Sequence, residues 1–446
     1  MAKQVLIPQF QQHIDQVVNI NGWINNKRSS GSIIFLQIRD GFDTVQAVAS
    51  KKDLPAQTFD SLEKITIESS VSITGIVKNE PRSPNGFELQ ITDAQIICLS
   101  PEDYPIQKKR DGSKHSIQFL FNYRHLHLRS QRQWAILRVR NNIINSIYSF
   151  LSEKEFTKID SPILTPNACE GTTTLFEVPY TPAWEDNAKD GPHVYLTQSG
   201  QLYLESAIMS FSRVFDFGPV FRAEKSKTRR HLNEFWMMDA EMAFFDHAQN
   251  MKLQEELTQR IINDVLSKCS KELEILKRDT SALEKCTDKK YQIITHKEAI
   301  KILQRLGSDI KDRDDLGADD ETILTKQFDT PIFVEKYPRE AKAFYMKDDP
   351  EDNSRVLNAD MLAPEGYGEV IGGSQREDNY DVLIEKIKKE KLDMDDFQWY
   401  LDLRKYGSVP HSGFGIGLER YVRWICGLTH IRETIPFPRT MKRIRP

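Results

Sequence analysis

The chain has 446 residues, too many for one ordinary domain and enough for two or three. Its hydrophobic content of 39% and aromatic content of 10% are typical of a globular protein with sizeable cores. The formal net charge is −4, from 61 basic and 65 acidic residues, which excludes nucleic-acid binding through a general basic coat. Any contact with nucleic acid must therefore come from individually placed side chains.

Cysteine usage and hydropathy favour a reduced, cytoplasmic protein. The cysteines lie far apart and lack the spacing of a zinc site or a disulfide framework. They are Cys98, Cys169, Cys269, Cys286 and Cys426. The first residues, MAKQVLIPQF, contain no apolar run typical of a signal peptide, and no apolar segment of about 18 residues follows. We therefore expect a cytoplasmic location and no membrane attachment.

Residues 17–100 consist of short runs rich in β-branched residues, with apolar and polar side chains alternating. Five strands are expected, in VVNINGWINNKR, SIIFLQIRD, TVQAVAS, SVSITGIVKN and FELQITDAQIICLS. Asn, Gly, Asp and Pro separate them. This pattern fits a small Greek-key barrel of the OB type, and it also fits another small barrel or a sandwich.

After a charged stretch without regular periodicity, the pattern becomes helical. Apolar spacing in RQWAILRVRNNIINSIYSFLSEKEF predicts a long amphipathic helix that opens a second domain. Strand-like runs follow, including VFDFGPVFRAE and EFWMMDAEMAFF. The segment 247–330 is charged and helical, and we expect it to be an insertion packed on the catalytic core. The remainder, 331–446, returns to strands and ends in an apolar helix near 418–428.

Two strand-like segments and the basic loop between them are suited to a polyphosphate. FRAE ends the first strand at Glu224, KSKTRRH forms the loop, and the second strand contains Phe235. Guanidinium groups grip phosphate in a bidentate manner, and an aromatic ring offers a flat face to a purine. A solvated, charged hairpin turn would have the same composition.

The segment HSGFGIGLERYVRWICGL places a glycine-rich strand end directly before a helix that begins near Leu418. Arg420 would lie in the first helical turn, where free backbone N–H groups and the helix dipole attract anions. Gly413, Gly415 and Gly417 would let the backbone approach a ligand. A tight packing turn needs glycine just as much, so this motif alone is weak.

A third segment, APEGYGEVIGGSQRED, carries Glu369 and Arg376 around a Gly-Gly pair, with Asp360 upstream. Two acidic groups near a phosphate site suggest Mg²⁺ held between carboxylates and phosphates. Without that context, they would more often be solvated surface charges.

In this order the segments resemble the signature motifs of class II aminoacyl-tRNA synthetases. FLSEKEFTKIDSPILTP, with Pro162, resembles motif 1, the dimer element; FRAEKSKTRRHLNEFWMMDAE resembles motif 2; and GFGIGLERYVRWICGLTHIRETIPFPR resembles motif 3. Together with an OB-like domain in front, they resemble subclass IIb, the aspartyl, asparaginyl and lysyl enzymes, over essentially the whole chain.

The resemblance implies an α+β chain with two functional domains. An OB-type β-barrel would bind the anticodon over residues 1–102, and a hinge would follow over 103–129. The class II catalytic domain would span 130–446, built on an antiparallel β-sheet flanked by helices. The motif 1 resemblance implies a homodimer.

The resemblance also assigns residues to ATP and to the amino acid. Arg222 would bind the α-phosphate and Arg420 the γ-phosphate. The other residues implied at the nucleotide are Glu224, Arg230, His231, Phe235 and Glu369. Asp360 and Glu369 match the carboxylates that hold Mg²⁺, although their spacing is longer than in many relatives. Glu170, Gln201 and Asp239 would hold the α-ammonium group.

The side-chain pocket favours asparagine. Aspartyl enzymes carry a lysine where QSGQLYLE has Leu204, and here Glu205 follows it. A carboxylate would repel aspartate but accept hydrogen bonds from an amide NH₂, while Arg376 could donate to the amide oxygen. Glu205 could instead be a helix-face carboxylate that pairs with a neighbour. With asparagine as the substrate, the partners would be ATP and tRNA(Asn).

In the barrel, Phe35 and Gln46 fall on neighbouring strands, with Arg28 nearby. In this subclass the matching aromatic stacks on an anticodon base, and the matching glutamine reads the central uridine. Stacking combined with edge hydrogen bonds is the usual way to bind exposed single-stranded bases. Arg28 could contact phosphate. The pattern alone equally allows Phe35 in the barrel core.

Three other functions stay open at this point. One is an aspartyl enzyme of relaxed tRNA choice, against which Leu204 and Glu205 speak. Another is an ammonia-ligating asparagine synthetase, which the anticodon-like domain disfavours. The last is a catalytically inactive RNA-binding paralogue, which the retained Arg222 and Arg420 disfavour.

Overall fold

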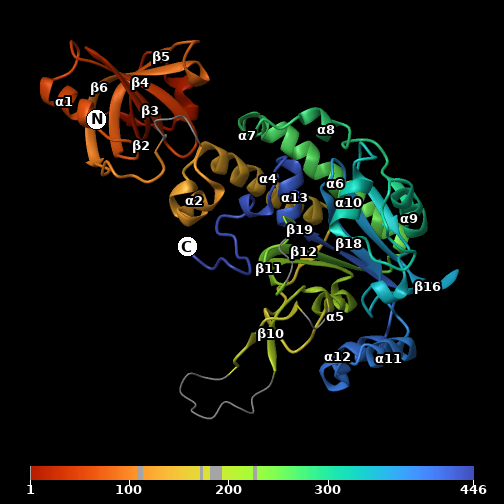
Figure 1. The fold of residues 1–446 in the computed structure, drawn as a ribbon. Helices are drawn as coiled ribbons and strands as arrows, with labels where there is room; N and C mark the ends of the chain where they lie inside the picture. The colour runs from red at the N-terminus through yellow and green to blue at the C-terminus, as the bar shows by residue number, and fades with distance from the viewer. Residues whose placement is uncertain (1, 108–113, 171–173, 181–192, 225–228) are drawn as a thin grey trace. The chain divides into compact units, whose positions relative to one another are not determined.

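The structure is a computed structural model that describes residues 2–107, 114–170, 174–180, 193–224 and 229–446 (Figure 1). The chain divides into two compact units, 1–123 and 124–446. Within the described residues, every helix is too short or too polar to span a lipid bilayer.

The first unit is a closed β-barrel. Its main strands are β2 (Val17–Ser30), β3 (Ile33–Arg39), β4 (Thr44–Ser50), β5 (Ser70–Asn79) and β6 (Phe87–Cys98). Strand β2 pairs with both β3 and β5, and β4 pairs in parallel with β6, so the sheet closes on itself. The strands correspond to those expected from the alternating pattern, and the expected small barrel is confirmed.

Alternation separates the barrel core from its outer face. On β3, Ile34, Leu36 and Ile38 are fully buried, whereas Phe35 and Gln37 between them are only partly buried. Short elements complete the unit: β1 (Lys3–Gln4), η1 (Ile7–His13), α1 (Ala56–Lys64), η2 (Pro84–Gly86) and α2 (Ile117–Asn122). Because side chains on a strand point to opposite faces in turn, the polar face stays available to a ligand.

The second unit is built on an eight-stranded sheet with the order β13-β14-β17-β18-β19-β12-β11-β7. The strands are β7 (Thr157–Lys158), β11 (Arg213–Phe221), β12 (Glu234–Ala243), β13 (Gln292–Thr295), β14 (Ile332–Glu335), β17 (Asn358–Ala363), β18 (Gly368–Gln375) and β19 (His411–Gly417). The inner pairings are antiparallel, as expected, but β7 and β13 pair in parallel with β11 and β14. The sheet as a whole is therefore mixed.

Helices cover both faces of this sheet. Figure 1 shows α4 (Gln131–Glu153), α6 (His247–Lys268) and α13 (Leu418–Ile425) grouped above the strands. Below them lie α5 (Gln201–Phe211) and the pair α11 (Tyr380–Lys389) and α12 (Met394–Lys405). The expected long helix corresponds to α4, and the expected C-terminal apolar helix corresponds to α13.

Short elements connect these layers. The remaining helices are α3 (Arg124–His127), α7 (Ser270–Leu276), α8 (Thr280–Glu284), α9 (His296–Arg305), α10 (Ala318–Thr325), η5 (Arg339–Ala341) and η6 (Ile431–Glu433). The short strands are β8 (Leu164–Thr165), β9 (Glu177–Val178), β10 (Val194–Leu196), β15 (Asp348–Asp349) and β16 (Asp352–Val356). Part of the expected hinge, 103–129, is helical in α2 and α3, while 108–113 lie outside the described residues.

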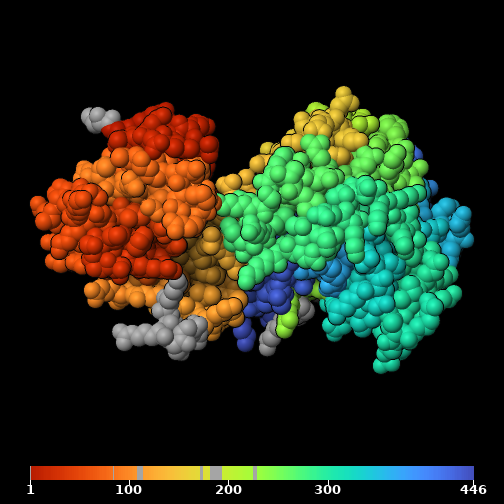
Figure 2. Space-filling view, turned by 90° about the horizontal axis from the view of Figure 1, so that it is seen from above, coloured from red at the N-terminus to blue at the C-terminus, as the bar shows by residue number. Residues whose placement is uncertain are grey.

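The segment 247–330 differs from the expected helical insertion in two respects. Its first helix, α6, belongs to the main core, since Leu257, Ile261 and Val265 are fully buried in one cluster with α4 and the sheet. It also contains β13, which extends the central sheet beside β14. Figure 2 shows that the segment, in green to cyan, also forms much of one face of the second unit. Four strand residues give too short a pattern to be recognised in the sequence.

Candidate active site

A cavity of about 620 Å³ opens on the central sheet of the second unit. Residues from β12, β18, β19 and the start of α13 line it, together with the chain after β11. It brings together twelve residues expected at ATP, Mg²⁺ or the amino acid: Glu170, Gln201, Arg222, Glu224, Arg230, His231, Phe235, Asp239, Asp360, Glu369, Arg376 and Arg420.

One end of the cavity is cationic. Helix α13 begins at Leu418 directly after Gly417, so Arg420 lies in the first turn, as the glycine-rich motif predicted. Arg420 Nη1 donates to Glu369 Oε2 at 2.9 Å, and Nη2 lies 3.4 Å from His231 Nε2. Burial lowers the pKa of His231, and the Arg420 guanidinium lowers it further. A neutral imidazole beside a guanidinium leaves this end suited to phosphate.

Arg222 and Phe235 face each other across the β11–β12 hairpin. The Arg222 guanidinium carbon lies 5.6 Å from the centre of the Phe235 ring. Arg222 Nη2 also lies 3.8 Å from Glu170 Oε1. The ring face and the guanidinium therefore meet in the cavity, where a purine and a phosphate could be bound side by side.

Arg230 is engaged with the protein more than expected for an ATP ligand. Its Nη1 donates to Glu321 Oε2 at 2.7 Å, its Nη2 donates to Gly366 O at 3.0 Å, and Nη2 also bonds Thr322. Glu321 Oε2 additionally accepts the N–H of Glu369 at 2.9 Å. Arg230 thus fastens helix α10 to the cavity wall, a role that the sequence of 247–330 did not suggest.

Two carboxylates converge next to the cationic end. Gly372 has Glu369 Oε1 and Asp360 Oδ1 beside it, 3.3 and 3.7 Å from where a Cβ would stand. Lys342 Nζ donates to Asp360 Oδ2 at 2.8 Å. Burial raises the pKa of Asp360 to about 6, against the effect of Lys342. Among the described residues no cluster of three or more metal-ligating side chains occurs, so a cation here would rely on two carboxylates and phosphate.

The opposite end of the cavity is lined by groups suited to an α-ammonium. Asp239 Oδ2 accepts hydrogen bonds from Ser199 Oγ at 2.8 Å and from the N–H of Gly200 at 2.9 Å. Glu170 Oε1 accepts from Tyr345 Oη at 3.3 Å. These bonds fix the carboxylates of Asp239 and Glu170 before a ligand arrives.

Gln198 supports this end and was not singled out in the sequence. Its Oε1 accepts the N–H groups of Cys169 and Glu170 at 3.2 and 3.0 Å, and its Nε2 donates to Thr174 Oγ1 at 2.8 Å. One side chain therefore ties down Glu170 and Thr174, on both sides of residues 171–173, which lie outside the described residues. Its place in the QSGQ segment was the only available signal.

Glu205 does not stand where the sequence placed it. It is fully buried and is absent from the described residues that line the cavity. Its carboxylate accepts hydrogen bonds from Tyr400 Oη at 2.8 Å and Gln201 Nε2 at 3.1 Å, and it pairs with Arg404 and His411. Helix α12 covers it, so its carboxylate faces Tyr400 and Arg404 rather than the cavity.

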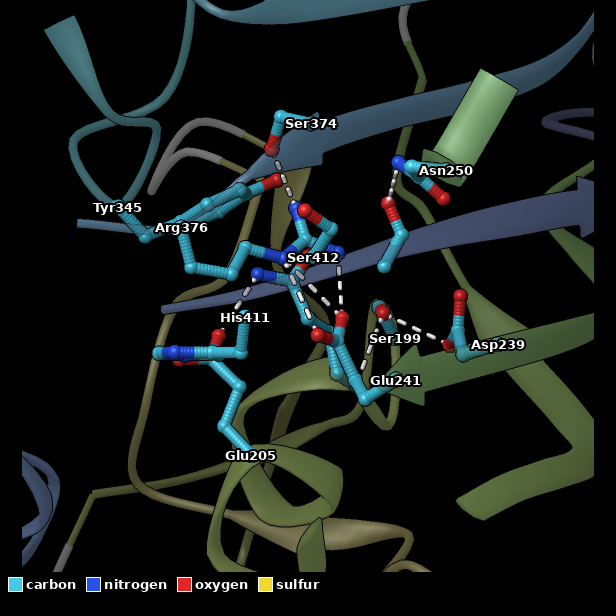
Figure 3. A network of polar contacts seen from close by, with 12 residues as sticks. Ser199, Glu205, Asp239, Glu241, Asn250, Tyr345, Ser374, Arg376, His411 and Ser412 are labelled. Carbon is cyan, nitrogen blue, oxygen red and sulfur yellow. Dashed lines mark hydrogen bonds and ion pairs between the residues drawn. The ribbon is translucent and has the colours of Figure 1, made fainter. Parts of the chain in front are cut away.

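Arg376 instead pairs with Glu241 (Figure 3). Arg376 Nε lies 3.1 Å from Glu241 Oε1, and Nη1 donates to Ser374 Oγ at 2.6 Å. Glu241 is fully buried, which acts to raise its pKa, while the paired Arg376 guanidinium acts to lower it. Glu241 stands two residues after Asp239, on the same face of β12. That alternation was the sequence signal that could have identified it.

The barrel carries a separate candidate nucleic-acid face. In the strand register, Phe35 on β3 lies opposite Arg28 on β2 and Val48 on β4. Gln46 lies opposite Gln37, and its Nε2 donates to Glu88 Oε2 at 3.0 Å. Phe35 is partly exposed and outside the barrel's buried cluster, so the alternative of a core phenylalanine is excluded.

Comparison with known families agrees with both units. The model for tRNA synthetases class II (D, K and N) matches residues 116–441, and the model for an OB-fold nucleic acid binding domain matches residues 18–97. The chain belongs to the class II tRNA synthetases of this group.

Curated relatives narrow the group to one member. The asparagine–tRNA ligase of Desulforamulus reducens is 50% identical over 441 residues, 99% of each chain. That of Thermus thermophilus is 46% identical over 449 residues, 99% of this chain and 100% of its own. The crystal structure of asparaginyl-tRNA synthetase from Pyrococcus horikoshii complexed with asparaginyl-adenylate superposes with a TM-score of 0.94, at 43% identity over 100% of both chains. Within the class, the family is that of the asparagine–tRNA ligases.

Proposed function

We propose that the chain activates L-asparagine with ATP and transfers it to the 3′-terminal ribose of tRNA(Asn). The observation that carries the proposal is a single cavity lined by Arg222 and Arg420 and also by Arg376, whose charge is balanced by the buried Glu241. The activity of the asparagine–tRNA ligases to which the chain is similar agrees with it, and the Pyrococcus horikoshii structure is complexed with asparaginyl-adenylate, which this reaction forms.

The first step is a nucleophilic substitution at the α-phosphorus of ATP. A carboxylate oxygen of asparagine forms a bond to phosphorus, the bond to the bridging oxygen breaks, and pyrophosphate leaves. No general base is needed because the carboxylate is already ionised. Arg222 would neutralise the α-phosphate and Arg420 the γ-phosphate. Orientation of the reactants and charge stabilisation would therefore account for the acceleration of this step. In the second step the ribose hydroxyl oxygen bonds to the adenylate carbonyl carbon, the bond from that carbon to the phosphate oxygen breaks, and AMP leaves, while the hydroxyl proton passes to a nearby oxygen such as one of the departing phosphate.

Selection of asparagine follows from the buried pair. An arginine alone would favour the carboxylate of aspartate over a neutral amide. Glu241, which is itself outside the cavity lining, cancels the charge of Arg376, so the Arg376 guanidinium presents N–H donors to a neutral amide. This pair replaces the expected pair of Glu205 and Arg376.

Mg²⁺ fits the two carboxylates at Gly372. Asp360 and Glu369 would hold it, and when bound it would neutralise negative charge on the phosphates. We expect chelation of Mg²⁺ to abolish pyrophosphate exchange and Glu369→Gln to raise the Mg²⁺ concentration needed for half-maximal exchange by about 10- to 100-fold. The matched control is Glu365→Gln, since Glu365 pairs with Arg278 outside the cavity. An unchanged Mg²⁺ dependence in Glu369→Gln would remove this assignment.

A homodimer is supported by the motif 1 resemblance and by exposed apolar side chains close to it. Phe211 is 53% exposed at the end of α5, and Phe244 is 67% exposed directly after β12. The two ends are neighbours, because the N–H of Ala243 donates to the carbonyl of Ser212. Arg213, beside them, donates to the carbonyl of Lys154 at the end of α4.

The reduced cysteines and the tRNA substrate favour a cytoplasmic enzyme.

The barrel face would bind the anticodon. We expect Phe35→Ala to weaken tRNA binding by about 1–3 kcal/mol, the value of one stacked base, and to leave tRNA-independent pyrophosphate exchange unchanged. Filter binding with tRNA(Asn) measures the first quantity. Phe42→Ala is the control, because Phe42 is 50% exposed but lies in the turn between β3 and β4. Equal losses in both variants would place the anticodon elsewhere.

The proposal is tested by ATP–pyrophosphate exchange with asparagine, aspartate and lysine in parallel. We expect exchange with asparagine alone. Exchange with aspartate as well would favour an aspartyl enzyme of relaxed choice. Absence of exchange, combined with retained tRNA binding, would instead identify an RNA-binding paralogue.

A further inference from the structure

Helix α12 contributes two side chains to a polar cluster behind the amino-acid end of the cavity. Tyr400 Oη lies 2.8 Å from both carboxylate oxygens of Glu205. Arg404 Nη2 pairs with Glu205 Oε2 and donates to Tyr400 Oη at 3.0 Å. The side chains of Glu205 and Arg404 are fully buried, and so is Tyr400. Buried charges are tolerated only with close partners, so this cluster has one well-defined geometry.

The cluster touches the cavity through a single residue of α5. Glu205 Oε1 accepts from Gln201 Nε2 at 3.1 Å, and Gln201 lines the cavity. The N–H of Gln201 donates to Ser199 Oγ at 3.1 Å, and Ser199 Oγ donates to Asp239 at 2.8 Å. A continuous chain of hydrogen bonds therefore runs from α12 to a carboxylate expected at the α-ammonium group.

The same cluster also reaches the side-chain pocket. His411 Nε2 lies 3.0 Å from Glu205 Oε2, and the carbonyl of His411 accepts the N–H of Arg376 at 2.9 Å. Figure 3 shows Glu205 and His411 beside the Arg376–Glu241 pair. Burial acts to raise the pKa of Glu205, but Arg404 and His411 hold it well below the usual range, so the carboxylate stays ionised.

We propose that Tyr400 and Arg404 are positioning residues for amino-acid selection, which act through Glu205 to fix Gln201 and the backbone that carries Arg376. The inference rests on the proposed function of the cavity. Neither side chain is among the described residues that line the cavity, so neither touches substrate. The α11–α12 pair is then a functional part of the amino-acid site, although it lies outside the three signature motifs.

The test is Tyr400→Phe in the full-length protein, which removes only the hydroxyl and keeps the packing of the ring against Phe344 and Phe397. We expect the KM for asparagine in pyrophosphate exchange to rise about tenfold, with the KM for ATP unchanged, because a hydrogen bond to a charged acceptor is lost only on the amino-acid side. A purely structural role would change thermal stability and both KM values together.

Tyr203→Phe is the matched control. Tyr203 also lies between α5 and α12, stacks on Trp399 with ring centres 5.1 Å apart, and bonds Thr165 Oγ1 at 2.6 Å, but does not contact Glu205. It should leave the KM for asparagine unchanged. The KM for asparagine of the double variant Tyr400→Phe/Glu205→Gln should be no higher than that of Glu205→Gln alone, because both changes break the same connection through Glu205.

Equal KM values for asparagine in Tyr400→Phe and Tyr203→Phe, in a wild-type background that exchanges with asparagine, would overturn the inference and leave the proposed function intact. Additive effects in the double variant would overturn it as well. A wild-type protein that does not exchange with asparagine would instead overturn the proposed function.

Discussion

Arg420→Ala is expected to lower kcat/KM for asparagine-dependent pyrophosphate exchange by at least about 10²–10³-fold, the usual cost of losing one preorganised charge-stabilising donor. Arg420 stands in the first turn of α13, and its guanidinium lies 2.9 Å from Glu369 at the end of the cavity assigned to the γ-phosphate. Affinity for tRNA(Asn), measured by filter binding, should be nearly unchanged, because the proposed anticodon face belongs to the separate barrel unit.

Arg423→Ala is the control for this result. Arg423 lies on the same helix, stacks on Tyr367 at 5.0 Å, and is absent from the described residues that line the cavity. Its exchange activity should fall far less than that of Arg420→Ala. If Arg420→Ala lost tRNA affinity to the same extent as exchange, the defect would be in folding or the ATP site would lie elsewhere.

Glu241→Gln is expected to shift the preference between asparagine and aspartate toward aspartate by about 10²–10³-fold. The substitution leaves Arg376 buried without a counter-charge, and removing one partner of a buried ion pair costs about 3–5 kcal/mol. The carboxylate of a bound aspartate can restore the balance, whereas the amide of asparagine cannot. The lower part of that range, about 3–4 kcal/mol, corresponds to about 10²–10³-fold in relative affinity. The measurement is the ratio of kcat/KM values for the two amino acids.

Loss of stability alone must be separated from this change of preference. Glu272→Gln removes another buried carboxylate, one that pairs with Arg138 on α4 away from the cavity. It should reduce the melting temperature without altering the ratio of asparagine to aspartate activation. A Glu241→Gln variant with an unchanged ratio would mean that the buried pair does not select the side chain.

Local patterns were sufficient to predict the parts of the fold and site that depend on short segments. Alternation gave the strands of the barrel, helical spacing gave α4, and the glycine-rich motif placed Arg420 in the first turn of a helix. Motifs 2 and 3 and the segment around Glu369 also came together, with Arg222, Glu369 and Arg420 in one cavity, because β12, β18 and β19 are neighbours in the sheet.

Features that depend on distant segments could not be read in the same way. The Glu205 carboxylate accepts a hydrogen bond from Tyr400, 195 positions further along the chain, and no local pattern reveals that α12 covers Glu205. Likewise, the sequence motif around Arg230 predicts an ATP ligand, but the Arg230 guanidinium donates to Glu321, 91 positions further along the chain. In both cases tertiary contacts decide whether a charged side chain meets substrate or protein.

Strand β13 limits how far this enzyme could be shortened. The sequence pattern predicts that 247–330 is an insertion packed on the catalytic core, yet α6 forms part of that core and β13 pairs with the whole length of β14. A truncated version would expose the backbone N–H and C=O groups of β14, and open strand edges invite pairing between chains. A minimal enzyme made by this deletion would therefore carry an aggregation site at the border of its own active-site sheet.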